Sequence, residues 1–474
     1  MNLYPEITDE IRSAAPGPST TAFFDMDGTL INGFSVTSFF LDRVRTGKVT
    51  VGQAFEQMVS LLGNRVSGHD YSKLLAEGAA QVAGLSEAEF IESGERVFRK
   101  YTAAAIYPES RAIVRAHQAQ GHRVVIISTA TPYQVAPIAK ELGIETFYCN
   151  RFATEDGKFT GELSGPMVFG KGKLEAASEY CDSHKVRLED AWFYSDGAED
   201  LPLLEKAGFP RPMNPDSELA EISRRNGWKT RHFSSRGVPG AREFIRTGLS
   251  YGSFIGAALT IAPTWFLNRS KREAVNLATT IWGEVGTALA GIDLEVNGEE
   301  HLWKQRPAVF MFNHQSGTDA LIAARLLRRD FTGIAKKELA SHPLAGPLFR
   351  IADTVFLDRK NTQKAIDSMK AVTQTLEQGL SIVVAPEGTR SDGDRLGSFK
   401  KGPFHIAREA GVPVVPIVIH NSTDVLPKSG IFVRPSRVFV DVLAPISTKD
   451  WQAEHVNDHV ALVRQQFLDA LGQS

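Results

Sequence analysis

The sequence predicts two successive α/β domains joined through a helical, apolar segment. Three observations support this. The chain has 474 residues, more than the roughly 100–200 residues of an ordinary domain. In each half, short apolar runs typical of strands alternate with helical stretches. Between the halves lies "SSRGVPG" (234–240), a composition typical of a linker. In the first half this alternation favours a doubly wound parallel sheet, in which chemistry lies at the carboxyl ends of the strands.

Composition excludes several classes of protein. The chain is 42% hydrophobic and 23% charged, as globular proteins are, and its net charge of −2 does not favour binding to nucleic acid. Its two cysteines, Cys149 and Cys181, cannot form a disulfide framework and suit a reducing compartment. Residues 1–19 are polar and contain no apolar signal core, so we expect an N-terminal extension and not a secretion signal.

We predict the first domain over residues 20–233. Between its first and second strands lies a long insertion, about residues 33–108, whose pattern is helical throughout, and we predict that it forms a cap over the site below it. The strands of this domain are expected at 21–26, 122–129, 144–150 and 190–196.

Polar residues follow these strands. Asp25 and Asp27 stand two positions apart at the end of the first strand, so one carboxylate can attack as a nucleophile while the other handles a proton. Asp196 and Asp200 follow a later strand, and hard oxygen ligands of this kind suit Mg²⁺. Alone, an Asp pair after a strand is more often a turn or helix cap. Ser128 ends another strand and Lys173 opens a helix, and both suit a phosphate group.

Four segments together carry a resemblance. "DMDGTL", "VVIIST", "GKGK" and "YSDGAEDLPLL" resemble the motifs of the haloacid-dehalogenase-like phosphatases, especially the phosphoserine-phosphatase-like branch with a helical cap, over about residues 20–232. The resemblance implies Asp25 as the nucleophile that forms an aspartyl-phosphate and Asp27 as general acid/base. Ser128 and Lys173 would bind phosphate, with Lys171 as a substitute for Lys173. It also implies Mg²⁺ held by Asp25, Asp196 and the carbonyl of Asp27, with Asp200 in support.

The substrate of this half stays open. Gly197 stands where this branch often has Ser, and the cap shows no pair that would recognise serine. A soluble phosphomonoester, phosphoserine and a phospholipid are all compatible with the motifs. An inactive scaffold is the alternative, and the intact set of four aspartates argues against it.

The middle of the chain is helical and apolar. After a linker at 234–246, we predict a membrane-docking helical segment over 247–291. Residues 247–268 carry no charge and are long enough to span a bilayer, yet they include Gly, Ser, Thr and Pro263. Interfacial or re-entrant packing, a buried core segment and a true span are the three interpretations, of which we favour the first.

The last domain is predicted over 292–474, with strands at 307–313, 353–359, 380–388, 413–420 and 437–445. His314 and Asp319 follow its first strand. No Ser or Cys nucleophile is evident, and no nearby His or Cys offers metal-ligand spacing. His314 can instead take a proton from a substrate while Asp319 fixes its tautomer. A structural hydrogen bond at a strand end is the alternative.

Basic residues gather at the later strand ends of a nearly neutral chain, which indicates an anionic ligand. Arg359 and Arg390 directly follow apolar runs, and Gly388 permits close approach of the backbone to a phosphate. The other members are Lys336, Lys337, Lys360, Lys400 and Lys401.

"NHQSGTD", "TVFLDR", "APEGTR" and "VPVVPI" resemble the four blocks of the glycerolipid acyltransferases, especially 1-acylglycerol-3-phosphate acyltransferases, over about residues 290–445. One departure is "ADTVFLDR", where Gly and Phe-Ile are usual. The resemblance implies an α/β acyltransferase domain in which His314 activates a lysophospholipid hydroxyl to attack acyl-CoA or acyl carrier protein. The implied substrate-binding residues are Lys337, Arg359, Glu387, Gly388, Thr389, Arg390 and Pro416; Glu387 would orient the phosphate-binding loop and Pro416 would shape the acyl-donor site.

We therefore expect a bifunctional enzyme at the cytoplasmic face of a membrane, monotopic or peripheral. Its expected partners are lysophosphatidic acid, acyl-CoA, a phosphomonoester and the membrane surface, and not nucleic acid. The alternatives are a different lysophospholipid acceptor and a non-enzymatic lipid-binding module, which would not need the His314/Asp319 pair.

Overall fold

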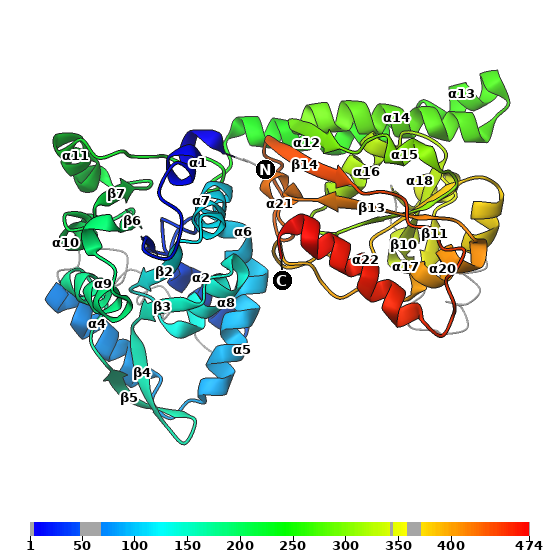
Figure 1. Ribbon diagram of the computed structural model, residues 1–474. Helices are drawn as coiled ribbons and strands as arrows, with labels where there is room; N and C mark the ends of the chain where they lie inside the picture. The colour runs from blue at the N-terminus through cyan, green and yellow to red at the C-terminus, as the bar shows by residue number, and fades with distance from the viewer. Residues whose placement is uncertain (1–3, 48–67, 342–344, 358–370, 474) are drawn as a thin grey trace. The chain divides into compact units, whose positions relative to one another are not determined.

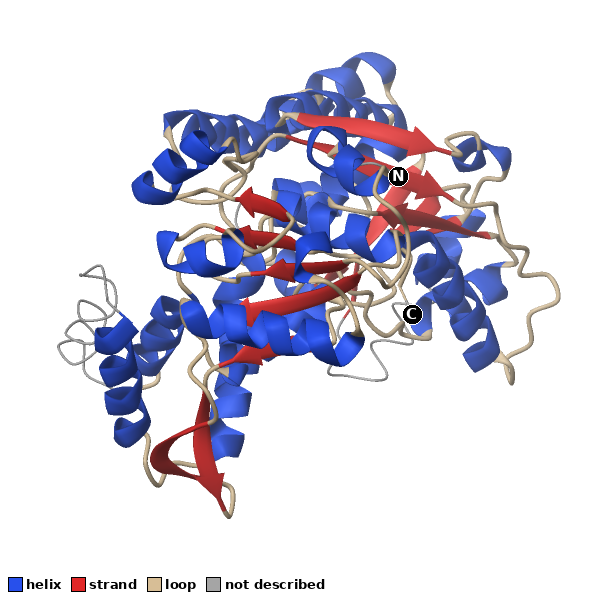
Figure 2. Cartoon of the chain, turned by 60° about the vertical axis from the view of Figure 1, so that its left-hand side comes forward, coloured by secondary structure: helices blue, strands red, loops and turns tan. Residues whose placement is uncertain are grey.

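The computed structural model describes residues 4–47, 68–341, 345–357 and 371–473 (Figure 1). The chain splits into two compact units, Met1–Val238 and Pro239–Ser474, each with its own hydrophobic core. Figure 2 shows the strands of the sheets as arrows between helices.

The first unit contains a five-stranded sheet in the order β3-β2-β1-β6-β7, with every neighbouring pair parallel. The doubly wound parallel sheet predicted for this half is thus present. All four residues of β1 are buried, because helices cover both faces of the sheet. Its strands are β1 Thr21–Phe24, β2 Arg123–Ser128, β3 Thr146–Cys149, β6 Trp192–Ser195 and β7 Phe209–Pro212.

Alternating side chains of these strands enter two separate cores, as the period of two in a strand requires. Phe24 and Ile126 pack on one face with the helices α1 Pro5–Arg12, α7 Pro108–Ala119 and α8 Pro132–Leu142. Phe23 and Val125 pack on the other face with α9 Lys171–His184, α10 Leu201–Leu204 and α11 Ser217–Asn226. Two short 3₁₀ turns, Leu188–Asp190 and Ala198–Asp200, flank β6.

The described residues of the insertion between β1 and β2 are largely helical. They form α2 Ser35–Arg45, α4 Gly68–Gln81, α5 Glu87–Val97, a π-helical turn Phe98–Thr102 and α6 Ala103–Ala105. Residues 52–62, "GQAFEQMVSLL", which belong to the insertion predicted to be helical, lie outside the described residues. An antiparallel hairpin that the sequence analysis missed, β4 Arg151–Glu155 with β5 Lys158–Ser164, packs against α4.

The region after the linker forms three helices, α12 Ala241–Ala258, α13 Ile261–Asn268 and α14 Lys271–Ala290. The uncharged stretch 247–268 is therefore divided between two helices, with the break at Leu259 and Thr260. Among the described residues, none of the helices combines the length and apolar character needed to cross a bilayer.

The second unit contains a mixed seven-stranded sheet in the order β11-β10-β12-β9-β13-β14-β8. All neighbouring pairs are parallel except β13 with β14, so β14 and β8 run against the other five strands. The strands are β8 Ile292–Asn297, β9 Val309–Phe312, β10 Phe331–Lys336, β11 Val355–Leu357, β12 Ser381–Val384, β13 Val414–Ile419 and β14 Ser436–Val442. The sequence predicted five of them and missed β8 and β10.

Helices again cover both faces of this sheet. Phe310 and Ile417 pack with α14 and α16 Asp319–Leu327, whereas Val309 and Val414 pack with α20 Gly402–Ala410 and α22 Val456–Leu471. The shorter helices are α15 His301–Lys304, α17 Lys337–Ala340, α18 Ala345–Ile351 and α21 Ser422–Val425.

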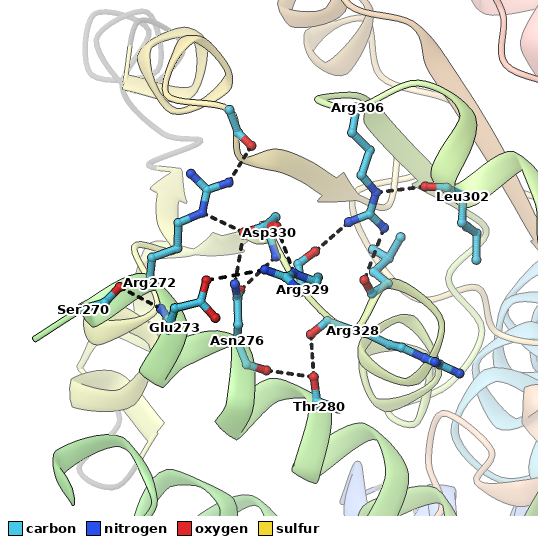
Figure 3. A network of polar contacts seen from close by, with 12 residues as sticks. Ser270, Arg272, Glu273, Asn276, Thr280, Leu302, Arg306, Arg328, Arg329 and Asp330 are labelled. Atoms are coloured by element: carbon cyan, nitrogen blue, oxygen red, sulfur yellow. Dashed lines mark hydrogen bonds and ion pairs between the residues drawn. The ribbon is translucent and has the colours of Figure 1, made fainter. Parts of the chain in front are cut away.

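A polar network fixes the carboxyl end of α16 (Figure 3). Arg306 donates from Nη2 to the carbonyl of Leu327, the last residue of the helix, at 3.2 Å and from Nη1 to the Arg329 carbonyl just beyond it. From α14, Arg272 pairs with Asp330 at 2.6 Å and Asn276 donates to the same carboxylate. The other end of α16 begins with Asp319, so this network holds the helix that carries a candidate catalytic residue.

Candidate active sites

The first site lies where the strand order of the sheet reverses, between β1 and β6. Asp25 follows β1 directly, and its backbone N–H donates to the Tyr194 carbonyl at 2.9 Å. Lys173, 1% exposed, donates from Nζ to Asp25 Oδ1 at 2.8 Å and to Asp200 Oδ2 at 2.7 Å. The structure thus brings together residues that are 148 positions apart in the chain. Lys171 is exposed, so Lys173 is the lysine at this site.

Asp27 faces the start of the cap. Its Oδ1 accepts from the Ser35 N–H at 2.9 Å and its Oδ2 from the Ser35 hydroxyl at 3.0 Å, while Gln134 donates to that hydroxyl. Burial raises the pKa of Asp27 to about 7. A carboxyl group with a pKa near neutral pH can both give and take a proton there, as a general acid/base must.

Asp196 packs tightly against the turn after β1. A Cβ on Gly28 would lie 1.9 Å from Asp196 Oδ2, and Gly28 has φ +75°, so both space and backbone conformation require glycine. Thr29 donates to Asp196 Oδ1 at 3.4 Å. Burial raises the pKa of Asp196 and of Asp25, and for each of them a neighbouring carboxylate adds to the effect.

This chemistry fits a divalent cation. One buried ammonium group, that of Lys173, lies among the carboxylates of Asp25, Asp196 and Asp200. Asp200 Oδ1 is buried without a hydrogen-bond partner. The other oxygen, Asp200 Oδ2, accepts from the Ser195 hydroxyl at 2.6 Å, which makes Asp200 a support for Lys173. Across the described residues, no three His, Cys, Asp or Glu side chains are grouped to hold a metal ion. A cation here would depend on two carboxylates, those of Asp25 and Asp196, and on backbone and water oxygens.

The remaining predicted residue of this site, Ser128, is buried at the end of β2, where its hydroxyl accepts from the Ala130 N–H at 3.2 Å. The sequence analysis missed Tyr71. From α4 of the cap, its hydroxyl donates to the Thr129 carbonyl at 2.7 Å, and its ring stacks on Phe169 at 4.5 Å between centroids. Burial raises the pKa of Tyr71 to about 12, so the hydroxyl remains a donor. Nothing in the sequence distinguishes this tyrosine from others.

The second site lies at the carboxyl end of β9. His314 Nδ1 is 2.8 Å from Asp319 Oδ2, which also accepts from the N–H groups of Gln315 and Ser316 at 2.8 Å each. Asp319 is fully buried, whereas the His314 side chain is 28% exposed. Because a carboxylate accepts hydrogen bonds, the proton of neutral His314 lies on Nδ1, and Nε2 is left as the base.

Glu387 holds the backbone of the same segment. Its Oε1 accepts from the His314 N–H and its Oε2 from the Gly397 N–H, both at 2.8 Å. The His314 carbonyl in turn accepts from the Ser391 N–H at 2.8 Å. Burial raises the pKa of Glu387. These contacts join the segments after β9 and β12, and the role of Glu387 in orienting the phosphate-binding loop stays a prediction.

Arg390 lies beside this segment. A Cβ on Gly317 would be 3.8 Å from Arg390 Nη1, which places the guanidinium group near the His314–Asp319 turn. Lys428 donates to the Arg390 carbonyl at 2.7 Å and to Asp392 at 2.6 Å, a link that the sequence analysis missed. Gly388 has φ +77°, a conformation that glycine adopts without strain, and Thr389 beside it is exposed.

Two further predicted residues lie on other elements of this unit. Pro416 is buried within β13 opposite Met311, inside the sheet and not at its carboxyl edge. Lys337 is exposed at the start of α17. Arg359, together with Lys360, lies outside the described residues.

Comparison with known proteins separates the same two halves. Residues 22–205 match the family described as haloacid dehalogenase-like hydrolase, and residues 293–420 match the family described as acyltransferase. The chain is 38% identical to a 1-acyl-sn-glycerol-3-phosphate acyltransferase of Limnanthes alba over 42% of this chain and 70% of that protein. It is 30% identical to a phosphoserine phosphatase of Mycobacterium tuberculosis over 51% of this chain and 78% of that protein.

Among solved structures, the chain is similar to a 1-acyl-sn-glycerophosphate acyltransferase from Thermotoga maritima. The two are 26% identical, with a TM-score of 0.41, over 49% of this chain and 98% of that one.

Proposed function

The chain belongs to the haloacid dehalogenase-like hydrolases through its N-terminal half and to the 1-acyl-sn-glycerol-3-phosphate acyltransferases through its C-terminal half, and we propose that it catalyses both reactions. In this proposal the C-terminal half acylates lysophosphatidic acid to phosphatidic acid, and the N-terminal half hydrolyses a phosphomonoester. The observation that carries the first assignment is the His314–Asp319 pair at 2.8 Å with Arg390 close to the same turn.

The acyl transfer needs no nucleophile from the protein. The free hydroxyl of lysophosphatidic acid gives its proton to His314 Nε2 as its oxygen attacks the thioester carbonyl of acyl-CoA or of an acyl carrier protein. The carbon–sulfur bond breaks, and the departing thiolate takes the proton from the imidazolium. Asp319 stabilises that imidazolium through Nδ1. Arg390 suits the acceptor phosphate, because its guanidinium lies beside the turn that carries the base.

In the hydrolase half, Asp25 Oδ1 accepts from Lys173, and Oδ2 would be the nucleophilic oxygen. Attack on phosphorus breaks the bond to the leaving alcohol, which takes its proton from Asp27. Asp27 then removes a proton from the water that hydrolyses the aspartyl-phosphate. Mg²⁺, held by Asp25, Asp196 and the Asp27 carbonyl, would neutralise negative charge on the phosphate. Lys173 and Ser128 would hold the phosphate oxygens.

We also propose that the protein docks on the cytoplasmic surface of a membrane through α12 and α13. Its acceptor is a membrane lipid, and these helices, which pack on α14, and the turn between them expose large apolar side chains. They are Phe244, Ile245, Leu249, Tyr251, Ile255, Leu259, Trp265, Phe266 and Leu267.

Two variants of the full chain test the two-site proposal. Replacing His314 with Ala removes the base and is expected to lower acyl transfer to lysophosphatidic acid by about 10²–10⁴-fold while hydrolysis stays at the wild-type rate. Replacing Asp25 with Asn is expected to abolish Mg²⁺-dependent hydrolysis across a panel that includes phosphoserine and lysophosphatidic acid, and to leave acyl transfer intact.

The reciprocal design makes the outcome decisive. If either variant loses both activities, the two-site proposal is wrong. If the wild-type protein transfers acyl groups to another lysophospholipid and not to lysophosphatidic acid, the acceptor assignment alone is wrong.

A further inference from the structure

The segment Asp394–Gly397 connects the candidate acyltransferase site to the last helix, α22. On the side of the site, the Gly397 N–H donates to Glu387 Oε2 at 2.8 Å. A Cβ on Gly397 would lie 2.7 Å from the same oxygen, so the backbone rests directly against the carboxylate. The other oxygen of Glu387 accepts from the His314 N–H, so a displaced Gly397 would move the group that holds His314.

Two side chains near the carboxyl end of the chain hold this segment from the other side. Arg464 donates from Nε to the Gly397 carbonyl at 3.0 Å and from Nη2 to the Leu396 carbonyl at 3.3 Å. Gln473 accepts from the Leu396 N–H at 2.9 Å and donates to the Asp394 carbonyl at 2.8 Å. These four hydrogen bonds leave the segment little freedom to move relative to α22.

Gln473 is itself held in place. α22 ends at Leu471, Gly472 follows with φ +64°, and the Gln473 N–H returns to the Leu468 carbonyl at 2.9 Å. This bond pattern around a left-handed glycine is that of a Schellman cap. One turn earlier, Phe467 is fully buried and packs edge-on against Phe399 at 5.3 Å between centroids. The cap therefore fixes Gln473 on a helix that is anchored in the core.

We infer that Arg464 and Gln473 are positioning residues for acyl transfer, which act through Gly397 and Glu387 on His314. The inference rests on the proposed acyltransferase activity. Neither side chain reaches the reacting atoms in this scheme; each fixes the backbone that keeps Glu387 bonded to the His314 N–H. Loss of either should therefore slow the chemical step more than it weakens substrate binding.

The test compares three variants of the full chain. In Gln473→Ala, kcat for acyl transfer is expected to fall by about tenfold, the effect of one or two net hydrogen bonds, with KM for acyl-CoA within about twofold of wild type. Arg464→Lys keeps the positive charge but loses the planar guanidinium group that donates to two carbonyl groups, so a similar fall in kcat is expected. The matched control is Gln465→Ala, because Gln465 lies on the same helix and donates to Asp469 at an exposed position; wild-type kcat is expected.

A second measurement separates positioning from general loosening of the fold. If Gln473 acts through Glu387, adding Gln473→Ala to Glu387→Gln should change kcat by less than about twofold, because coupled residues are not additive. A full tenfold further loss in the double variant would overturn the inference, as would wild-type kcat in Gln473→Ala. Hydrolysis by the N-terminal half, expected to be unchanged in every variant, reports the concentration of chain in each assay. A wild-type chain without acyl transfer would instead overturn the proposed function.

Discussion

At the scale of single residues, burial and ion pairing determine how the charged groups beyond β1 are held. The aspartates were recognisable because each follows a predicted strand, and the structure places them at one edge of the sheet. The choice between Lys171 and Lys173 could not be made from the sequence, because it depends on which side of the first turn of α9 faces the sheet. Lys173 is buried between Asp25 and Asp200. Although burial opposes its charge, Asp200 and Asp25 hold the pKa of Lys173 above its ordinary value.

The ion pairs of Lys173 predict that its replacement by Met strongly destabilises the first unit. Lys173→Met removes the only ammonium bonded to Asp25 and Asp200 among the described residues and leaves two buried carboxylates without a cation. We expect the free energy of unfolding of the first unit to fall by about 3–5 kcal/mol, measured by calorimetry of the full chain in EDTA, and hydrolysis to be lost.

Lys171→Met is the matched control, because Lys171 is exposed two positions earlier on the same helix. Equal stability of the two variants would mean that the buried ammonium does not stabilise the carboxylates.

At the scale of elements, strands that are apolar runs ending in polar residues were predicted correctly. Strands that are marked by a turn, or that are only half-buried, were missed. The strands at Asp25 and His314 were identified because they are fully buried on both faces. The β4–β5 hairpin was missed although Asp156-Gly157, with φ +49° and +74°, is a typical two-residue hairpin turn. β8 was missed because its exposed residues alternate with half-buried ones, and a single half-buried strand carries little apolar signal.

Contacts between elements could not be predicted from sequence, and the attachment of α4 to the core is an example. Tyr71 joins the cap to the carbonyl beside Ser128 and to Phe169 before α9. We expect Tyr71→Phe to keep the ring stacking but lose the hydrogen bond, and to lower kcat/KM for hydrolysis by about fivefold to tenfold through a less fixed cap. A steady-state assay with one phosphomonoester measures this.

The control for this prediction is Tyr101→Phe, because the Tyr101 hydroxyl also forms a hydrogen bond, in this case as the acceptor from Arg45 at an exposed position within the cap. A loss of equal size in both variants would show that any cap hydroxyl has this effect and would contradict a specific role for Tyr71.

At the scale of the whole molecule, each candidate site takes its described residues from one compact unit. The hydrolase residues all lie before Val238 and the acyltransferase residues all lie after Pro239. The sequence predicted this division because its two sets of motifs do not overlap. The sequence does not determine whether residues 247–268 span a membrane, lie at its surface or pack in the protein core, because an uncharged segment of that length is compatible with all three. The structure divides it into two helices that expose apolar side chains.

The membrane proposal therefore makes its sharpest prediction at α12 and α13. Deleting residues 247–268 would be a poor test, because Thr247 accepts a hydrogen bond from the Val433 N–H and α12 packs on α14. Replacing Leu259, Phe266 and Leu267 with Ser is better, since these side chains are 73%, 72% and 76% exposed and contribute little to the core. We expect binding to phospholipid vesicles, measured by flotation, to fall at least about hundredfold, because three apolar side chains no longer leave water.

The matched control replaces Leu41, Ile91 and Leu462 with Ser, because these apolar residues are 50%, 54% and 51% exposed on other helices. Vesicle binding by this control should equal that of wild type. In the α12–α13 variant, acyl transfer to a water-soluble, short-chain acceptor should persist while transfer to an acceptor held in vesicles falls with binding. Undiminished vesicle binding by that variant would show that the exposed apolar face of α12 and α13 does not dock the protein on the membrane.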